Sequence, residues 1–225
     1  MDRECLATAY QLIAELLLHP DDRNTTRIAA LRQRLGAAPP LSLASIEKFL
    51  AHPSADLRDE YVRTLELSPP CPLYLGAYLF DEPTTCRGVG TSPRNAYMLE
   101  LVGIYRHFGF DLAGRELPDY VPTVLEFLSL SLQHPERDRI GLRRRLVEHY
   151  VRPALAPLLA ALNKYESPYA LLVESLKHVV EEDIRDMGSV PAWRPPESSP
   201  ERQGRRLRVL TENGRLSSEP VEVQP

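Results

Sequence analysis

Residues 116–120 are the part of the sequence whose residue types and spacing could do chemistry. Glu116 and Asp119 supply two carboxylates, Tyr120 follows directly, and Phe127 comes two helical turns later. We expect Glu116 and Asp119 to be exposed at a helix start, beside the two rings. Such carboxylates suit a partner peptide in which Arg or Lys neighbours apolar residues, because charge-assisted hydrogen bonds orient the basic groups and apolar contacts add buried area. The same residues could instead serve only their own fold, with Asp119 capping a helix and Glu116 paired internally. Residue chemistry leaves both interpretations open.

The residues that catalysis or metal binding would need form no recognisable pattern. The six histidines are scattered and the three cysteines form no CxxC pair, so no metal-ligand spacing is present. The glycines of residues 87–91 lack the strand and the Lys-Ser/Thr of a phosphate-binding loop, and no serine lies in a nucleophile elbow. The arginines at 143–145 are typical of solvated helix charge, and Cys71 is expected to be a structural thiol. The sequence therefore predicts a binding protein, not an enzyme, with no cofactor and no metal.

One helix must position the carboxylates of residues 116–120. Apolar side chains recur after residue 119 at helical spacing and form one stripe: Val121, Val124, Leu125, Leu128 and Leu132. Asp119 is expected to be the N-cap, its carboxylate accepting from the free N–H groups of the first turn. Pro122 then falls at the third helical position, where no intrahelical donor is needed. Glu126 is expected to point away from the stripe.

Helical spacing interrupted by Pro and Gly predicts an all-α fold for the rest of the body. The predicted helices cover residues near 3–18, 28–35, 43–50, 54–65, 93–108, 142–162 and from 167 to 187. Ser54 and Ser92 are expected to be N-caps, and a break or kink is expected near Pro153 and Pro157. The proline-rich residues 68–80 predict an exposed turn that leads into a short apolar helix.

Length and composition indicate one helical domain at residues 1–187, followed by a Pro/Arg/Glu-rich flexible tail at 188–225. Trp193 is the one residue of that tail expected to dock, on its own domain. The net charge of −4 argues against a nucleic-acid binder. Acidic residues near the N-terminus and the charge at Glu15 predict no signal peptide and no membrane span. The odd number of cysteines fits a reducing, cytoplasmic setting.

The string from Glu116 to Leu128 also resembles a family motif. Glu-Leu-Pro-Asp-Tyr at 116–120, an apolar run and Glu-Phe-Leu at 126–128 resemble the Glu-x-Pro-Asp-His segment and its sequel in the TorD/DmsD/NarJ family of molybdoenzyme maturation chaperones. The likeness is greatest to the NarJ type, the assembly chaperone of nitrate reductase. Residues 166–172 form a second NarJ-type match, and residues 61–65, followed by the proline-rich turn, have the same order as in the family.

The resemblance implies a single-domain helical bundle that binds the N-terminal segment of an apo-molybdoenzyme catalytic subunit until the molybdenum cofactor is inserted. The residues that it and the local chemistry assign to peptide binding are Glu116, Pro118, Asp119, Tyr120, Phe127, Tyr61, Pro72 and Tyr74. Tyr120 stands where the family usually has His, so a role that rests on an imidazole does not carry over. Two alternatives stay open: a related client, such as a chlorate, selenate, dimethyl sulfide or hydrocarbon-oxidising enzyme, and a helical adaptor without a molybdoenzyme client. A monomer or weak homodimer is expected.

Overall fold

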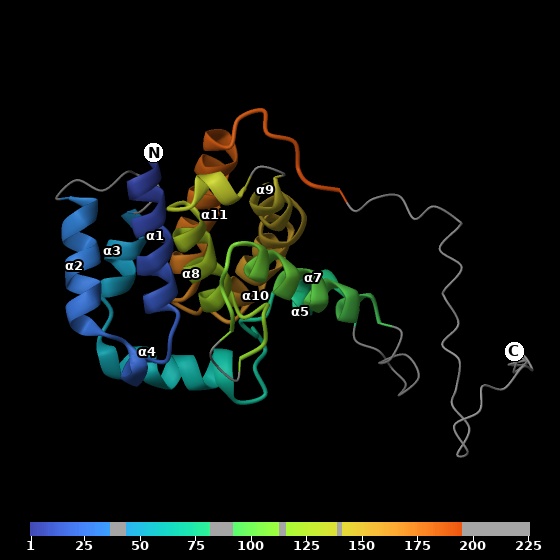
Figure 1. The fold of residues 1–225 in the computed structure, drawn as a ribbon. Helices are drawn as coiled ribbons and strands as arrows, with labels where there is room; N and C mark the ends of the chain where they lie inside the picture. The colour runs from blue at the N-terminus through green and yellow to red at the C-terminus, as the bar shows by residue number, and fades with distance from the viewer. Residues whose placement is uncertain (37–43, 82–91, 113–115, 139–140, 195–225) are drawn as a thin grey trace, which may run out of the picture. The chain divides into compact units, whose positions relative to one another are not determined.

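The N-terminal helix α1 (Arg3–Leu16) lies at the centre of the fold. In the computed structural model it packs against α2 (Thr25–Leu35), α8 (Val121–Ser131) and α11 (Ala170–Asp186), with α2 and α8 on opposite sides (Figure 1). Its predicted apolar stripe is buried: Leu6, Tyr10, Ile13 and, at the C-cap, Leu17. Burial of each such side chain stabilises the fold by about 1.5–3 kcal/mol, so α1 anchors three neighbouring helices.

The structure describes residues 1–36, 44–81, 92–112, 116–138 and 141–194. The remaining α-helices are α3 (Ala44–Leu50), α4 (Ser54–Tyr61), α5 (Gly76–Leu79), α7 (Pro93–His107), α9 (Leu142–Leu146) and α10 (Arg152–Lys164). Short 3₁₀ turns lie at Pro20–Asp22 and Pro135–Arg137, and π-helical turns at Val62–Glu66 and Val147–Val151. These ranges contain no β-strand, only an isolated bridge between Tyr74 and Tyr120. The predicted all-α fold class is therefore confirmed.

Helix α7 follows its sequence signals closely. Ser92 Oγ accepts from the Arg94 N–H at 3.3 Å, Pro93 occupies the first turn, and Gly109 ends the helix with φ of +81°. The predicted stripe is buried: Tyr97, Leu101, Ile104 and Phe108. A cap, a first-turn proline and a terminal glycine thus set the helix limits locally.

Two helix starts differ from the prediction. Helix α4 begins at Ser54 with Pro53 at the cap position, so Ser54 is the first helical residue. Helix α11 begins at Ala170, because the Ala170 N–H first closes a tight turn onto the Ser167 carbonyl at 3.0 Å. Each start is shifted by one to three residues, as is common where a turn precedes a helix.

The expected irregularity near the prolines of the 142–164 segment takes the form of a π-helical turn. Residues 142–164 are helical throughout, and Val147–Val151 form the π turn just before Pro153. Proline lacks an N–H and crowds the carbonyl four residues earlier, and a wider turn relieves that contact. Pro157 is accommodated inside α10.

Residues 188–193 lie against α9. The Trp193 N–H donates to the Gly141 carbonyl at 3.1 Å, and the Trp193 ring stacks on the Arg145 guanidinium at 5.4 Å. Trp193 therefore docks on its own domain, as expected, and Met1–Trp193 form one compact unit. The domain boundary at residue 187 stays a prediction, and residues 195–225 lie outside the described part of the chain. Within the described ranges, no helix is long and apolar enough to cross a membrane.

Candidate functional site

Asp119 is buried and does not cap α8. The cap position belongs to Tyr120, whose side chain makes no capping hydrogen bond, and Pro122 lies at the second helical position. The Asp119 side chain is fully buried, and its Oδ2 accepts from the Gly76 N–H at 2.9 Å and lies 3.6 Å from Arg94 Nη2. The predictions that Asp119 is the N-cap and is exposed at the helix start are therefore wrong. Its carboxylate instead binds the N–H of Gly76, which is remote in sequence, and pairs with the Arg94 guanidinium.

The Asp119 backbone also holds the proline-rich segment against the start of α8. The Leu75 N–H donates to the Asp119 carbonyl at 3.1 Å, and the Val121 N–H donates to the Leu73 carbonyl at 2.8 Å. Cys71 and Leu73 are buried, so the predicted exposed turn is wrong for this part of residues 68–80. The predicted short helix is present as α5. Burial raises the pKa of the Cys71 thiol, in keeping with a structural role.

Burial raises the pKa of the Asp119 carboxyl above its ordinary value, and the Gly76 N–H and the Arg94 guanidinium offset part of that rise. A Cβ at Gly76 would lie 2.7 Å from Asp119 Oδ2 and 2.9 Å from Arg94 Nε. The close approach of this carboxylate thus requires glycine at position 76. Asp119 therefore positions the segment around Gly76 against the start of α8.

Glu116, Tyr74 and Tyr120 come together beside this anchor. The Tyr74 hydroxyl donates to Glu116 Oε2 at 2.8 Å, and the Tyr74 and Tyr120 rings lie 5.4 Å apart. Burial, followed by the hydrogen bond to Glu116, raises the pKa of Tyr74 to about 12. Glu116 is exposed and the two tyrosines are half-buried, so a carboxylate and two rings share one surface.

Tyr61 joins this surface to the second family-like stretch. Its hydroxyl lies 3.4 Å from that of Tyr120, and its ring packs edge-on against Tyr169 at 5.6 Å. Tyr169 accepts from Arg23 Nη2 at 2.8 Å and donates to the Leu57 carbonyl at 3.1 Å. Residues 116–120 and 166–172, far apart in the sequence, are therefore connected through one buried tyrosine.

The other predicted site residues have less access to solvent. Phe127 is buried among Tyr105, Phe108 and Phe110, at centroid distances of 4.7, 5.2 and 6.1 Å. Pro118 is buried and its carbonyl accepts from the Tyr105 hydroxyl at 2.7 Å, and Pro72 is half-buried. Phe127 thus lies in the core and does not extend the aromatic surface at Glu116.

A cavity of about 230 Å³ opens between α1 and α8 at Glu116 and Tyr120, and we call it the acidic groove. Its lining residues are Gln11, Ala14, Glu15, Leu18, Arg27, Glu116, Tyr120, Pro122, Thr123 and Glu126. Glu15 Oε2 lies 3.6 Å from Arg27 Nη1, and this arginine is the only basic residue among the described lining groups. The groove therefore carries two carboxylates, Glu116 and Glu126, that no lining cation balances.

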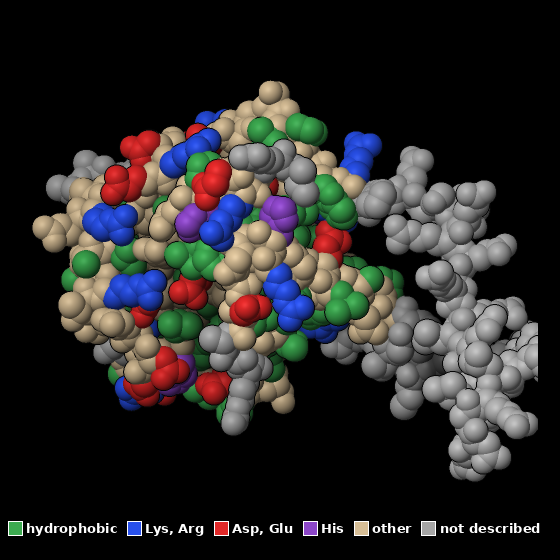
Figure 2. Space-filling model, viewed as in Figure 1, with side chains coloured by type: hydrophobic (Ala, Val, Ile, Leu, Met, Phe, Trp, Pro, Cys, Tyr) green, Lys and Arg blue, Asp and Glu red, His purple; other side chains and the backbone are tan. Residues whose placement is uncertain are grey.

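Sequence reasoning missed Glu15 and Glu126 as groove residues. In the sequence, Glu15 is only a charged residue inside the apolar run of α1. In the structure its side chain is 7% exposed and lines the groove. Glu126 is exposed, as predicted, on the far side from the apolar stripe. Elsewhere, Figure 2 shows acidic and basic side chains interspersed over the visible face. A cluster of carboxylates around one cavity is thus a local feature and does not follow from the net charge.

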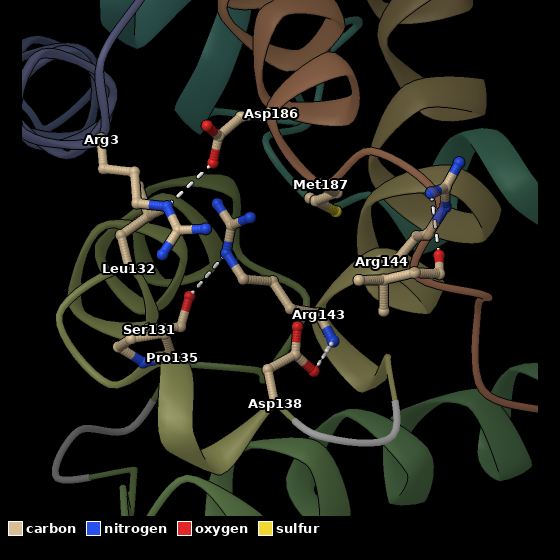
Figure 3. Close-up of a pocket in the computed structure, with 10 residues that line it drawn as sticks. Arg3, Ser131, Leu132, Pro135, Asp138, Arg143, Arg144, Asp186 and Met187 are labelled. Atoms are coloured by element: carbon tan, nitrogen blue, oxygen red, sulfur yellow. Dashed lines mark hydrogen bonds and ion pairs between the residues drawn. The ribbon is translucent and has the colours of Figure 1, made fainter.

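The arginines at 143–145 are engaged by the fold, contrary to the prediction of solvated helix charge. Arg143 is buried beside a cavity of about 130 Å³, where its Nε donates to Ser131 Oγ at 2.9 Å (Figure 3). Its Nη1 donates to Asp183 Oδ1 at 2.6 Å, and the Tyr10 hydroxyl donates to Asp183 Oδ2 at 2.7 Å. This network ties α1, α8, α9 and α11 together, and the Arg143 charge is paired with Asp183 inside the fold.

Arg144 and Arg145 are also paired. Arg144 Nη1 donates to the Gly188 and Val190 carbonyls at 2.6 and 2.8 Å, and Arg145 Nη2 donates to Glu100 Oε2 at 3.1 Å. The glycine-bearing residues 87–91 lie outside the described part of the chain. Among the described residues, no three His, Cys, Asp or Glu side chains are grouped as metal ligands.

Known proteins resemble this chain in sequence and in fold. The family model described as nitrate reductase delta subunit matches residues 7–170. The nitrate reductase molybdenum cofactor assembly chaperone NarJ of Escherichia coli K12, and that of strain O157:H7, are each 37% identical over 84 residues, which is 37% of this chain. The match spans 32% of the length of those relatives.

A crystal structure from Archaeoglobus fulgidus, titled as that of a candidate redox enzyme maturation protein, has a similar fold. The TM-score is 0.53 at 19% identity, over 80% of this chain and 94% of that one. At this identity the likeness establishes the helical fold alone. The family-model match covers most of the body, and the chain belongs to the nitrate reductase delta subunit family.

Proposed function

We propose that this protein is a cytoplasmic maturation chaperone that binds the N-terminal segment of an apo-molybdoenzyme catalytic subunit, of the nitrate reductase kind, before molybdenum cofactor insertion. Membership of the nitrate reductase delta subunit family supports this proposal, as does the similarity to the E. coli relatives, which are nitrate reductase molybdenum cofactor assembly chaperones. The observation that carries the binding part is the acidic groove, where Glu116 and Glu126 flank Tyr120.

The groove suits a basic segment on physical grounds. The one lining arginine, Arg27, is paired with Glu15, so Glu116 and Glu126 have no cation partner among the described lining residues. Hydrogen bonds to charged groups contribute about 1.5–3 kcal/mol each, and these two carboxylates therefore favour Arg or Lys over a neutral residue. The rings of Tyr74 and Tyr120 lie beside Glu116 and add apolar and cation–π contact with such a side chain. Glu116 and Tyr120 are therefore the proposed contact residues.

The other site residues act in this proposal mainly by holding the contact surface in place. Asp119 fixes the segment that carries Tyr74, through its bond to Gly76. Tyr61 helps to position Tyr120, because the hydroxyls of the two tyrosines lie 3.4 Å apart. Pro118, Pro72 and Phe127 shape the backbone and the core around the groove.

Catalysis is not part of the proposed role. A binding protein of this kind needs no ATP hydrolysis, because a higher affinity for the immature client than for the mature one is enough for selective binding and release. Clients related to nitrate reductase would present a similar basic segment, so only a binding experiment with a defined catalytic subunit identifies the client.

The test is native mass spectrometry of the purified chain with the molybdoenzyme catalytic subunit encoded nearest to its gene. The subunit is prepared with and without molybdenum cofactor, and also without its N-terminal 30 residues. We expect a complex with the cofactor-free subunit only, and its loss on truncation. Equal binding of all three preparations, or of none, would contradict the proposal and favour a helical adaptor. The same spectra report whether the free chain is a monomer or a weak homodimer.

A further inference from the structure

A second cavity of about 230 Å³ lies on the other side of α8, and we call it the apolar groove. No basic side chain lines it among the described residues, and its lining residues are Tyr105, Phe110, Leu112, Phe127 and Leu130, together with Asp111, Thr123 and Glu126. Phe127 is buried, and Leu112 is 37% exposed at the edge. The chemistry of this cavity thus differs from that of the acidic groove.

Thr123 and Glu126 line both grooves. The acidic groove lies where α8 meets α1, and the apolar groove lies where α8 meets residues 105–112. The two cavities are therefore neighbours, separated only by the exposed ridge of α8 that these two side chains form.

Charge is distributed unevenly across this ridge. In the apolar groove, Asp111 lies 3.4 Å from Arg106 Nε, so an arginine already balances its charge. The Glu126 carboxylate has no such partner within the described chain and faces both cavities. A ligand that crosses the ridge meets Glu116 and Glu126 on one side. On the other side it meets mainly aromatic and leucine side chains, with Asp111, paired to Arg106, among them.

We propose that one client segment occupies both grooves, with a basic side chain in the acidic groove and a bulky apolar side chain in the apolar groove. This inference rests on the proposed function and specifies the order of the residues that are recognised. Glu126 would fix the register, because it contacts the segment where the segment crosses α8.

The geometry sets the spacing of the two recognised residues. The grooves flank one helix, so their centres are about 10 Å apart, the diameter of a helix with its side chains. An extended segment covers that distance in about three residues. A helical segment needs about seven residues, or two turns.

Photocrosslinking tests this arrangement on the full chain. p-Benzoylphenylalanine is placed at Gln11 in the acidic groove or at Leu112 in the apolar groove. The probe is a synthetic peptide of the first 30 residues of the catalytic subunit. We expect mass spectrometry to find adducts of the Gln11 variant close to a basic residue, and of the Leu112 variant at an apolar residue about three or seven positions away.

The outcomes separate this inference from the proposed function. Adducts at Gln11 but none at Leu112, with peptide binding intact, would overturn the second groove and leave the function standing. No binding and no adduct at either position would overturn both. Dimers of the chain crosslinked through Leu112 would instead identify the apolar groove as a contact between copies, and would also overturn the inference.

A pair of variants gives an independent readout. We expect Leu112→Ala to weaken binding of the peptide about fivefold, the effect of losing one apolar contact, and to leave binding unchanged when the matching apolar residue of the peptide is Ala. Leu99→Ala is the matched control, because Leu99 is 74% exposed on α7 and lines neither groove. Equal weakening of both peptides by Leu112→Ala would contradict the assigned contact.

Discussion

The Asp119 carboxylate accepts a hydrogen bond from the Gly76 N–H, 2.9 Å away and across 43 residues of sequence. Together with the backbone bonds at Leu73 and Leu75, it fixes the proline-rich segment to the start of α8. Tyr74 lies within that segment and reaches Glu116. The geometry of the proposed contact surface therefore depends on a buried carboxylate that is closed to solvent.

Gly76→Ala tests this anchor. The added Cβ would lie within 3 Å of both Asp119 Oδ2 and Arg94 Nε, and overpacking of this kind costs about 1–3 kcal/mol. We expect the free energy of unfolding, measured in urea, to fall by that amount. Gly103→Ala is the control, since no described residue outside the α7 backbone lies within 4 Å of a Cβ added at this position. It should stabilise the helix by about 0.5–1 kcal/mol, and destabilisation of equal size in both variants would contradict the account.

The raised pKa of Asp119 predicts a defined pH dependence. The native state holds the proton more tightly than the unfolded state, so the stability due to this group is full below the ordinary Asp pKa of about 3.9. It is lost as pH rises through the raised native pKa. Asp119→Asn has no such titration. We expect the stability of the Asn variant, relative to wild type, to increase as pH rises above 4 and then level off. A relative stability that falls over the same range would show the opposite shift.

The buried network at Arg143 predicts a large loss of stability on removal of one partner. Asp183→Ala leaves the Arg143 guanidinium buried without its carboxylate, and such a change costs about 3–5 kcal/mol. The exposed pair Arg152–Glu181 is the control, and Glu181→Ala should change stability by no more than about 1 kcal/mol. Urea unfolding measures both. Similar losses of unfolding free energy in the two variants would contradict the assignment of Arg143–Asp183 as a buried pair.

Docking of residues 188–193 can be followed through the single tryptophan of the chain. Gly141 has φ of +73°, and a Cβ there would collide with the Pro191 carbonyl oxygen. We expect Gly141→Ala to displace Trp193 from α9 and shift its fluorescence emission to longer wavelength. Gly36→Ala is the control, because Gly36 has φ of +85° and no described residue lies within 4 Å of a Cβ added there. An unshifted spectrum in the Gly141 variant would contradict the docking.

Local signals predicted much of the helical framework. The apolar stripe of α8 is periodic in the sequence, and the cap, proline and glycine that limit α7 adjoin its ends. Short-range rules were therefore sufficient to predict both helices. The cap at Asp119 and the solvation of Arg143 were predicted wrongly, because the preferred partners, Gly76 and Asp183, are 43 and 40 residues away. A capping rule considers only neighbouring residues in the sequence, so it does not include such partners.

The candidate site was predictable in part for the same reason. Glu116, Tyr74 and Tyr120 meet as expected, since a contiguous motif supplied two of them. Glu15 and Glu126 join Glu116 only through the packing of α1 on α8. The apolar groove likewise depends on how residues 105–112 pack on α8, and no sequence pattern marks it.

The central claim is that the carboxylates of the acidic groove bind a basic client segment. Its most direct test is calorimetric titration of the chain with the N-terminal 30-residue peptide of the catalytic subunit. Glu116→Gln and Glu126→Gln should each weaken binding about tenfold, as expected for loss of one charged hydrogen bond, whereas Asp59→Asn, at an exposed position of α4 outside both grooves, should not. Unchanged affinity in both glutamine variants, each shown to be folded, would contradict the claim.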